Sequence, residues 1–339
     1  MRWNWSRRRS FRIGVGAILA YFLRNYIYPT FIILQCPFTE TWRLRRLRIS
    51  HQRDHFDITF NSYPIELPLA INTSLPVPPI IHHVILGMPE VPNSWKAARK
   101  ACQAVHPGYN FTIWTDAEVG HFVAREFPGM VNTWQSYRYT IQRADSIRYM
   151  IMYKYGGIFL DSDLHCLRSL DPLRRFPFVA PAARPIGLSN GFFMAAPGHP
   201  LLKALVENLP YFNINWFGIP YATVMFSTGC HYMSSIHSIS PYAADLRVLW
   251  GPNNLHRLSG HVRTPLFEHL GSSSWHSDTA FLSKFSKREL CFSLFIVMAI
   301  IGCVAIYAGR WKKKKKKLNL TLPVSSQIKR NTSLSNRAL

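Results

Sequence analysis

The sequence lacks the short motifs by which several large enzyme classes are recognised. It contains no Gly-x-Gly-x-x-Gly fingerprint, no Walker loop and no Gly-x-Ser-x-Gly elbow. The sequence therefore does not belong to the dinucleotide-binding, P-loop or serine-hydrolase proteins that carry these motifs. No internal repeat is present. The 339 residues, 48% of them hydrophobic, are enough for one sizeable core together with membrane segments.

Acidic residues are scarce: 17 Asp and Glu stand against 40 Lys and Arg, for a formal net charge of +23. The excess lies in two flanks, because residues 1–48 hold ten Arg and one acid, and residues 310–339 hold ten Lys or Arg and no acid. The intervening residues 49–309 carry twenty basic and sixteen acidic residues, a net charge of +4. A basic groove on a folded face is not indicated, so we expect no nucleic-acid partner.

Cysteine is also sparse, with six residues in the chain. Cys36, Cys291 and Cys303 lie in apolar segments, and the remaining three lack the spacing of a metal site. These three are Cys102, Cys166 and Cys230. A disulfide between two of them is the alternative, and three buried thiols are the favoured interpretation.

Charge is absent from residues 290–309, a run long enough to cross a hydrocarbon core of roughly 30 Å as a helix. Arg310 and six lysines at 312–317 follow it, a flank typical of a stop-transfer segment. We predict a transmembrane helix over 290–309 and a basic cytosolic tail over 310–339. A buried C-terminal helix is the alternative.

The N-terminal part reads as a second membrane segment. Residues 1–48 begin with a basic region followed by apolar residues, which predicts an uncleaved membrane anchor, with an interfacial helix as the alternative. Residues 49–79 are polar and then proline-spaced, which predicts a stem or linker. With both ends cytosolic, the domain between them would face the secretory lumen.

Strand-like and helical segments alternate through residues 80–285, which we assign as the catalytic domain. Strands are predicted at 80–86, 109–114 and 158–161, and helices at 93–104, 116–127 (with Asp116 as the cap) and 141–155. This alternation predicts an α/β sandwich around a mainly parallel sheet. Ligands of such sheets bind beyond the carboxyl ends of the strands.

The most informative stretch is Tyr155-Gly156-Gly157-Ile158-Phe159-Leu160-Asp161-Ser162-Asp163. In an extended chain, side chains at i and i+2 point the same way, so Asp161 and Asp163 are expected to leave the strand side by side. Paired carboxylates suit Mg²⁺ or Mn²⁺ and leave room for a substrate diphosphate. The stretch predicts a metal-dependent enzyme acting on a nucleotide-activated substrate.

Three further positions are candidates for the same site. Asp145 and Arg148 share a helix face, either as a surface ion pair or as groups that bind sugar hydroxyls and a phosphate. His269 precedes a small Gly-Ser loop and could complete an Asp/Asp/His metal site. Asn190 is a candidate polar contact at the start of a strand, with a turn residue as the alternative.

Taken in order, these motifs resemble the glycosyltransferases of family 32. The resemblance covers about residues 78–285 and is carried by His82-His83, Trp114-Thr115-Asp116, Arg143 to Tyr149, Tyr155 to Asp163, and His269-x-Gly followed by Trp275-His276. Within the family, Ser227-Thr228-Gly229 and Gly271 to His276 resemble the fungal inositol phosphoceramide mannosyltransferases. A proline commonly follows the Thr-Gly pair in that subgroup, whereas this chain has Cys230.

The resemblance implies a GT-A fold, a GDP-mannose donor, Mn²⁺ (or Mg²⁺) and transfer with retention of configuration. It implies that Asp145 and Arg148 contact the donor, that Asp161 and Asp163 contact the donor and the metal, and that Gly157, Asn190, Trp275 and His276 also bind the donor. The implied acceptor is inositol phosphoceramide, in a Golgi or endoplasmic reticulum membrane, with a regulatory membrane subunit as a further partner. A mannosyltransferase acting on a protein-linked glycan and an inactive scaffold are the alternatives.

Overall fold

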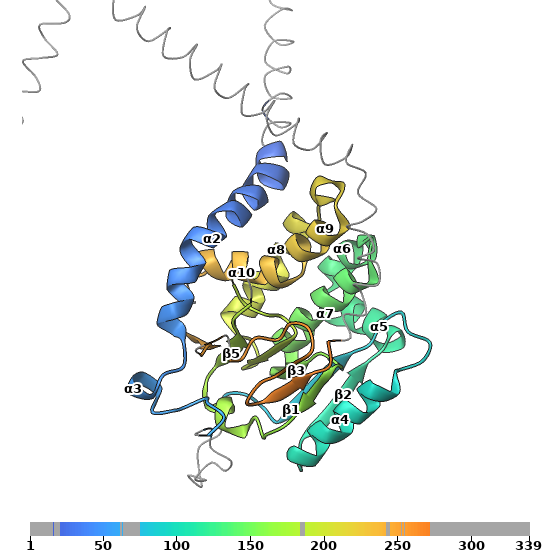
Figure 1. Ribbon diagram of the computed structural model, residues 1–339. Coiled ribbons are helices and arrows are strands. Elements are labelled where there is room, and N and C mark those ends of the chain that lie inside the picture. The colour runs from blue at the N-terminus through green and yellow to red at the C-terminus, as the bar shows by residue number, and fades with distance from the viewer. Residues whose placement is uncertain are drawn as a thin grey trace, which may run out of the picture. The chain divides into compact units, whose positions relative to one another are not determined.

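The centre of the protein is a six-stranded sheet with the order β2-β1-β3-β6-β5-β7 (Figure 1). The computed structural model describes Gly16 and residues 21–271, apart from 62, 64–74, 184–186, 242–244, 252 and 254. The strands of this sheet are β1 Ile80–Val84, β2 Asn110–Trp114, β3 Gly157–Leu160, β5 Phe178–Pro181, β6 Phe192–Ala195 and β7 Leu246–Leu249. Neighbours are parallel at β1/β2, β1/β3 and β5/β7, and antiparallel at β3/β6 and β5/β6. The predicted mainly parallel α/β fold is confirmed, with β6 running against the other strands.

The helices in the predicted regions begin and end close to where the hydrophobic periodicity places them. The longer helices are α2 Tyr28–Leu47, α4 Asn93–Val105, α5 Asp116–Glu126, α7 Thr140–Tyr155, α8 Pro200–Phe212, α9 Pro220–Ser227 and α10 Cys230–Ile239. The predicted cap of α5 is wrong by one residue, because Thr115 and Glu118 form the capping box. The Asp116 carboxylate instead accepts a hydrogen bond from the Gly87 amide at 2.8 Å.

Alternating side chains of the central strands fill two apolar layers, one on each face of the sheet. On β3, Phe159 packs in the layer that contains buried residues of α7, α8 and α10. Ile158 and Leu160 point to the opposite face and pack in a layer that includes Cys102 of α4. All four residues of β3 are buried, so the strand delivers its carboxyl end from the middle of the core.

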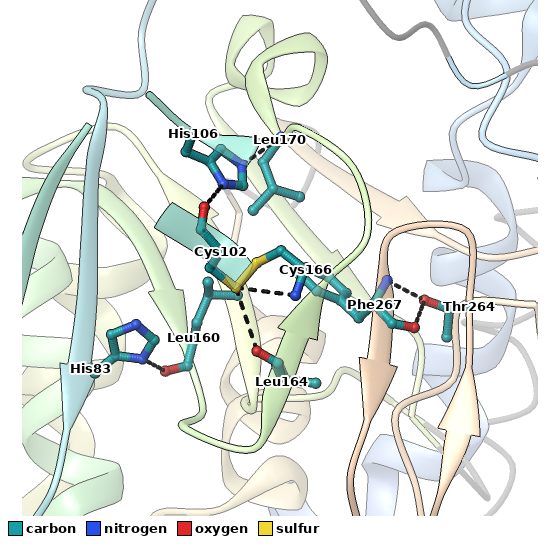
Figure 2. Close-up of a disulfide and its surroundings, with 9 residues drawn as sticks. All are labelled: His83, Cys102, His106, Leu160, Leu164, Cys166, Leu170, Thr264 and Phe267. Carbon is teal, nitrogen blue, oxygen red and sulfur yellow. Dashed lines mark hydrogen bonds between the residues drawn. A yellow bond between two sulfur atoms is a disulfide. The ribbon is translucent and has the colours of Figure 1, made fainter. Parts of the chain in front are cut away.

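A disulfide links α4 to a second, three-stranded sheet with the order β4-β9-β8. Its strands are β4 Leu164–Cys166, β8 Val262–Arg263 and β9 Phe267–His269. Figure 2 shows the bond between Cys102, on α4, and Cys166, at the end of β4. The favoured interpretation of three buried thiols is therefore wrong: Cys102 and Cys166 are paired, while Cys36 and Cys230 are free.

Part of the segment predicted as a stem belongs to the folded core. Ile49, Phe56, Ile58 and Val77 are buried in the layer that also holds Ile158. Because these side chains are large and apolar, the folded unit begins well before residue 80, and the stem assignment of 49–79 is corrected for them.

Of the two predicted membrane segments, the structure describes part of the N-terminal one and none of the C-terminal one. Residues 26–38 of the predicted anchor lie in η1 Leu23–Ile27 and in α2, which packs along α10. Among the described residues, no helix combines the length and the apolar character needed to cross a membrane. The predicted span at 290–309 and the tail at 310–339 lie outside the described residues, as do most of residues 1–20.

Candidate functional site

Asp161 and Asp163 lie on a turn between β3 and β4, at the carboxyl end of the central strand. The Leu164 amide donates to the Asp161 carbonyl at 3.1 Å, so the chain bends directly after β3. The expectation that the two carboxylates leave an extended strand side by side is therefore wrong. Asp161 contacts α7, and Asp163 contacts β9.

On the α7 side, Arg148 joins two carboxylates. Its Nη2 lies 3.0 Å from Asp145 Oδ1, and its Nη1 lies 3.3 Å from Asp161 Oδ1 and donates to the Asn190 carbonyl at 2.7 Å. The Arg148 and Asp145 side chains are only 5% and 6% exposed, whereas the Asp161 side chain is 38% exposed. The surface ion-pair alternative is wrong, because this pair is buried and holds the end of β3 against the helix.

Both oxygens of the Asp145 carboxylate have hydrogen-bonding partners within the protein. Besides Arg148, the Asn190 amide donates to its Oδ1 at 3.0 Å and the Thr228 hydroxyl donates to its Oδ2 at 3.2 Å. The Cys230 thiol donates in turn to the Asn190 side-chain oxygen at 2.9 Å, and burial raises the pKa of that thiol to about 11. Asn190 therefore orients Asp145, and Arg148 connects both residues to Asp161.

Two carboxylates, Asp145 and Asp161, share the guanidinium of Arg148, and the nearby Asp163 adds a third negative charge to this region. Although the Asp161 side chain is 38% exposed, loss of solvation inside the site raises the pKa of its carboxyl to about 7; Arg148 opposes this rise, while Asp163 and Asp145 add to it. Burial likewise raises the pKa of Asp145 to about 6 against the opposing charge of Arg148. Carboxylates crowded in this way favour an added cation.

On the β9 side, Asp163 and His269 face each other. Pairing of β4 with β9 sets Leu164 opposite His269, and the His269 Nε2 lies 3.4 Å from Asp163 Oδ2. The His269 Nδ1 lies 2.6 Å from the Gly260 carbonyl, which can only accept, so in the neutral ring Nδ1 carries the proton. In that tautomer Nε2 carries a lone pair beside the Asp163 carboxylate, and the carbonyl at Nδ1 is the kind of outer partner that a metal-binding histidine usually has.

The predicted set of three metal ligands is only partly assembled. Asp163 and His269 are together, but the Asp161 carboxylate is held by Arg148. Within the part of the chain that is described, no three His, Cys, Asp or Glu side chains converge on one metal position. The donor set that is present, one imidazole and one carboxylate, fits Mn²⁺ with water and phosphate oxygens as the other ligands.

Close packing of the backbone explains why glycine stands at two positions, one at the start of β3 and one beside Asp161. Gly157 adopts φ 98°, and a Cβ there would lie 2.6 Å from the Ile80 carbonyl oxygen. It stands at the opposite end of β3 from Asp161, so the structure does not bring it to the turn that holds the two aspartates. A Cβ on Gly191 would lie 2.6 Å from Asp161 Oδ2, so this glycine, which the motif analysis left out, makes room for the carboxylate.

The paired histidines of β1 are also structural. The buried His82 ring contacts the Gly156 carbonyl at 3.1 Å, and the His83 Nδ1 lies 3.0 Å from the Leu160 carbonyl (Figure 2). Burial lowers the pKa of both rings to about 4, so they stay neutral. Trp275 and His276, predicted to bind the donor, lie outside the described residues.

Comparison with known proteins places these residues in a family context. Residues 92–178 match the family described as a glycosyltransferase sugar-binding region containing a DXD motif. Inositol phosphoceramide mannosyltransferase 3 of Schizosaccharomyces pombe is 41% identical over 62% of this chain and 59% of its own length. A mannosyl phosphorylinositol ceramide synthase of Saccharomyces cerevisiae is 33% identical over 72% of this chain and 64% of its own length. Inositol phosphoceramide mannosyltransferase 1 of S. pombe is 31% identical over 70% of this chain and 76% of its own length.

Proposed function

Because the chain belongs to the glycosyltransferase family that contains the inositol phosphoceramide mannosyltransferases, we propose that it transfers mannose from GDP-mannose to the inositol of inositol phosphoceramide. The chain spans about three fifths of the length of the first two relatives, 59% and 64%, so activity, substrate and partners are all part of the proposal. The observation that carries it is the turn after β3, where Asp163 faces His269 and Asp161 meets Arg148.

The sheet topology supports a donor site beyond the carboxyl end of β3. Strand β3 is parallel to β1 on one side and pairs with the antiparallel β6 on the other, and Asp161 and Gly191 lie at the junction of β3 and β6. A nucleotide sugar of the GT-A kind would bind there. The exposed part of the Asp161 carboxylate is available to sugar hydroxyls, and Arg148 fixes its orientation.

Asp163 and His269 are the residues that would hold Mn²⁺ or Mg²⁺. When bound, the metal neutralises negative charge on the leaving diphosphate. The Gly260 carbonyl keeps the His269 Nδ1 protonated, which leaves Nε2 free to coordinate. Arg148 and Asn190 keep the Asp161 carboxylate in place while the acceptor hydroxyl approaches the anomeric carbon, so positioning supplies much of the rate. Retention of configuration is part of the proposal.

We place the catalytic domain in the lumen of the Golgi or endoplasmic reticulum, with both ends of the chain cytosolic. The Cys102–Cys166 disulfide supports this placement, because such bonds persist in oxidising compartments. The uncharged run at 290–309 would hold the domain near a membrane lipid acceptor, and a regulatory membrane subunit would share that membrane.

The test is transfer by the purified full chain in detergent with GDP-mannose and Mn²⁺, offered inositol phosphoceramide or a protein-linked glycan. Mannosylated lipid is the expected product, and Asp163→Asn should reduce it at least about a hundredfold. Glu207→Gln, which removes an exposed carboxylate on α8, is the matched control and should retain full activity. Transfer to the glycan alone would establish the alternative acceptor. No transfer to any acceptor, with the fold intact, would favour the inactive scaffold.

A further inference from the structure

Helix α2 has buried side chains on one face and an apolar stripe on the opposite face, and among the described residues nothing covers that second stripe. On the inner face, the apolar side chains of Ile33, Cys36 and Leu44 are buried against the domain, together with the carboxylate of Glu40. The outer stripe repeats every three to four residues and comprises Ile27 at the end of η1 and Phe31, Leu34, Phe38 and Trp42 of α2. These five side chains are between 55% (Ile27) and 86% (Phe38) exposed. A surface helix of a globular domain normally has one apolar stripe, so the second one calls for a partner.

The inner face is locked, so α2 cannot turn its outer stripe inward. Glu40 Oε1 lies 2.5 Å from His237 Nδ1 of α10, and both side chains are 0% exposed. The Arg43 guanidinium donates to the Ser240 carbonyl at 2.9 Å and also to the Ser238 carbonyl. These contacts satisfy carbonyls at the end of α10 and tie the two helices together. Figure 1 shows α2 running beside α10, and these contacts hold the outer stripe at a fixed orientation to the catalytic domain.

The chemistry of the outer stripe fits the surface of a lipid bilayer. It is rich in aromatic side chains, which prefer the boundary between headgroups and acyl chains. Exposed arginines Arg45, Arg46 and Arg48 lie at its C-terminal end, and the Arg46 guanidinium lies 3.6 Å from the Trp42 ring centroid. Glu40, the one acidic residue of 1–48, is buried, so nothing on α2 opposes anionic lipid.

The length of the stripe supports the same partner. From Ile27 to Trp42 it runs along about 22 Å of helix at roughly 1.5 Å per residue, long enough to make an extended contact with a surface. The same chain also carries the uncharged run 290–309 with its basic flank, which points to a bilayer as the surface at hand. We propose that α2 lies on the bilayer, with the stripe from Ile27 to Trp42 inserted at the headgroup boundary, and so orients the catalytic domain toward the membrane.

The test uses the full chain in vesicles of phosphatidylcholine and phosphatidylserine, without donor or acceptor. Photoreactive p-benzoylphenylalanine replaces Phe38 in one variant and Phe60, which is also exposed but lies outside α2, in the matched control. After irradiation, mass spectrometry should find at least about ten times more lipid adduct at position 38 than at position 60.

Equal adduct yields at the two positions, or adducts at position 38 to a second protein chain in place of lipid, would overturn the proposal. Because the readout is a covalent adduct formed without any sugar transfer, its failure is distinguishable from failure of the proposed enzymatic activity. Both positions are exposed in the native protein, so substitution there leaves the core packing unchanged.

Discussion

Breaking the Cys102–Cys166 bond should destabilise the domain and weaken the site together. The two cysteines are separated by 64 residues, and loop closure of that length stabilises a folded chain by about 4 kcal/mol. With a urea dependence of about 3 kcal/mol per M, the unfolding midpoint should fall by about 1 M. The site is affected because Cys166 ends β4, the strand that follows Asp163 and pairs with the strand of His269.

The assay is urea unfolding of the full chain in detergent, followed by pulse proteolysis, for the oxidised protein, the reduced protein and the variant Cys102→Ala/Cys166→Ala. Reduction should lower the midpoint of the native protein but leave that of the double variant unchanged. Peptide mapping without reductant verifies that the bond is present at the start. If oxidised and reduced native protein unfold at the same midpoint, the reasoning from loop closure is refuted.

Three further predictions concern ionisable side chains. Arg148→Met should lower the free energy of unfolding by roughly 3–5 kcal/mol, because it strands the buried Asp145 carboxylate; adding Asp145→Asn should restore part of the loss in urea titrations. His269→Gln should raise the Mn²⁺ concentration for half-maximal transfer about 10- to 100-fold, and an unchanged Mn²⁺ titration would remove it from the metal site with Asp163. Burial raises the pKa of Asp54, but hydrogen bonds from neighbouring arginines and a backbone amide outweigh it and lower the pKa to about 2. The resulting stabilisation, about 2 kcal/mol, should be present above about pH 4 and lost as the pH falls toward 2, so the difference in unfolding free energy between wild type and Asp54→Asn should shrink over that range.

Much of the fold followed from local pattern. Alternating apolar runs and helical stripes predicted β1, β2, β3, α4, α5 and α7 to within a few residues, because period-2 and period-3.6 patterns reflect which side chains face a core. The same spacing placed Asp145 and Arg148 on one face of α7. Local pattern missed the packing of Ile49 and Phe56, since isolated apolar residues in a polar segment give no sign of the core beside them.

The sequence by itself determined the α/β class, the Asp-x-Asp motif at the end of a buried strand and the placement of Asp145 and Arg148 on one helix face. Only the tertiary structure decided that the two aspartates diverge, one to Arg148 and the other to His269. It also decided that Cys102 pairs with Cys166 and that the Asn190 amide donates a hydrogen bond to Asp145. These contacts join segments far apart in the chain, and their partners depend on strand register and turn geometry, which spacing along the sequence does not encode.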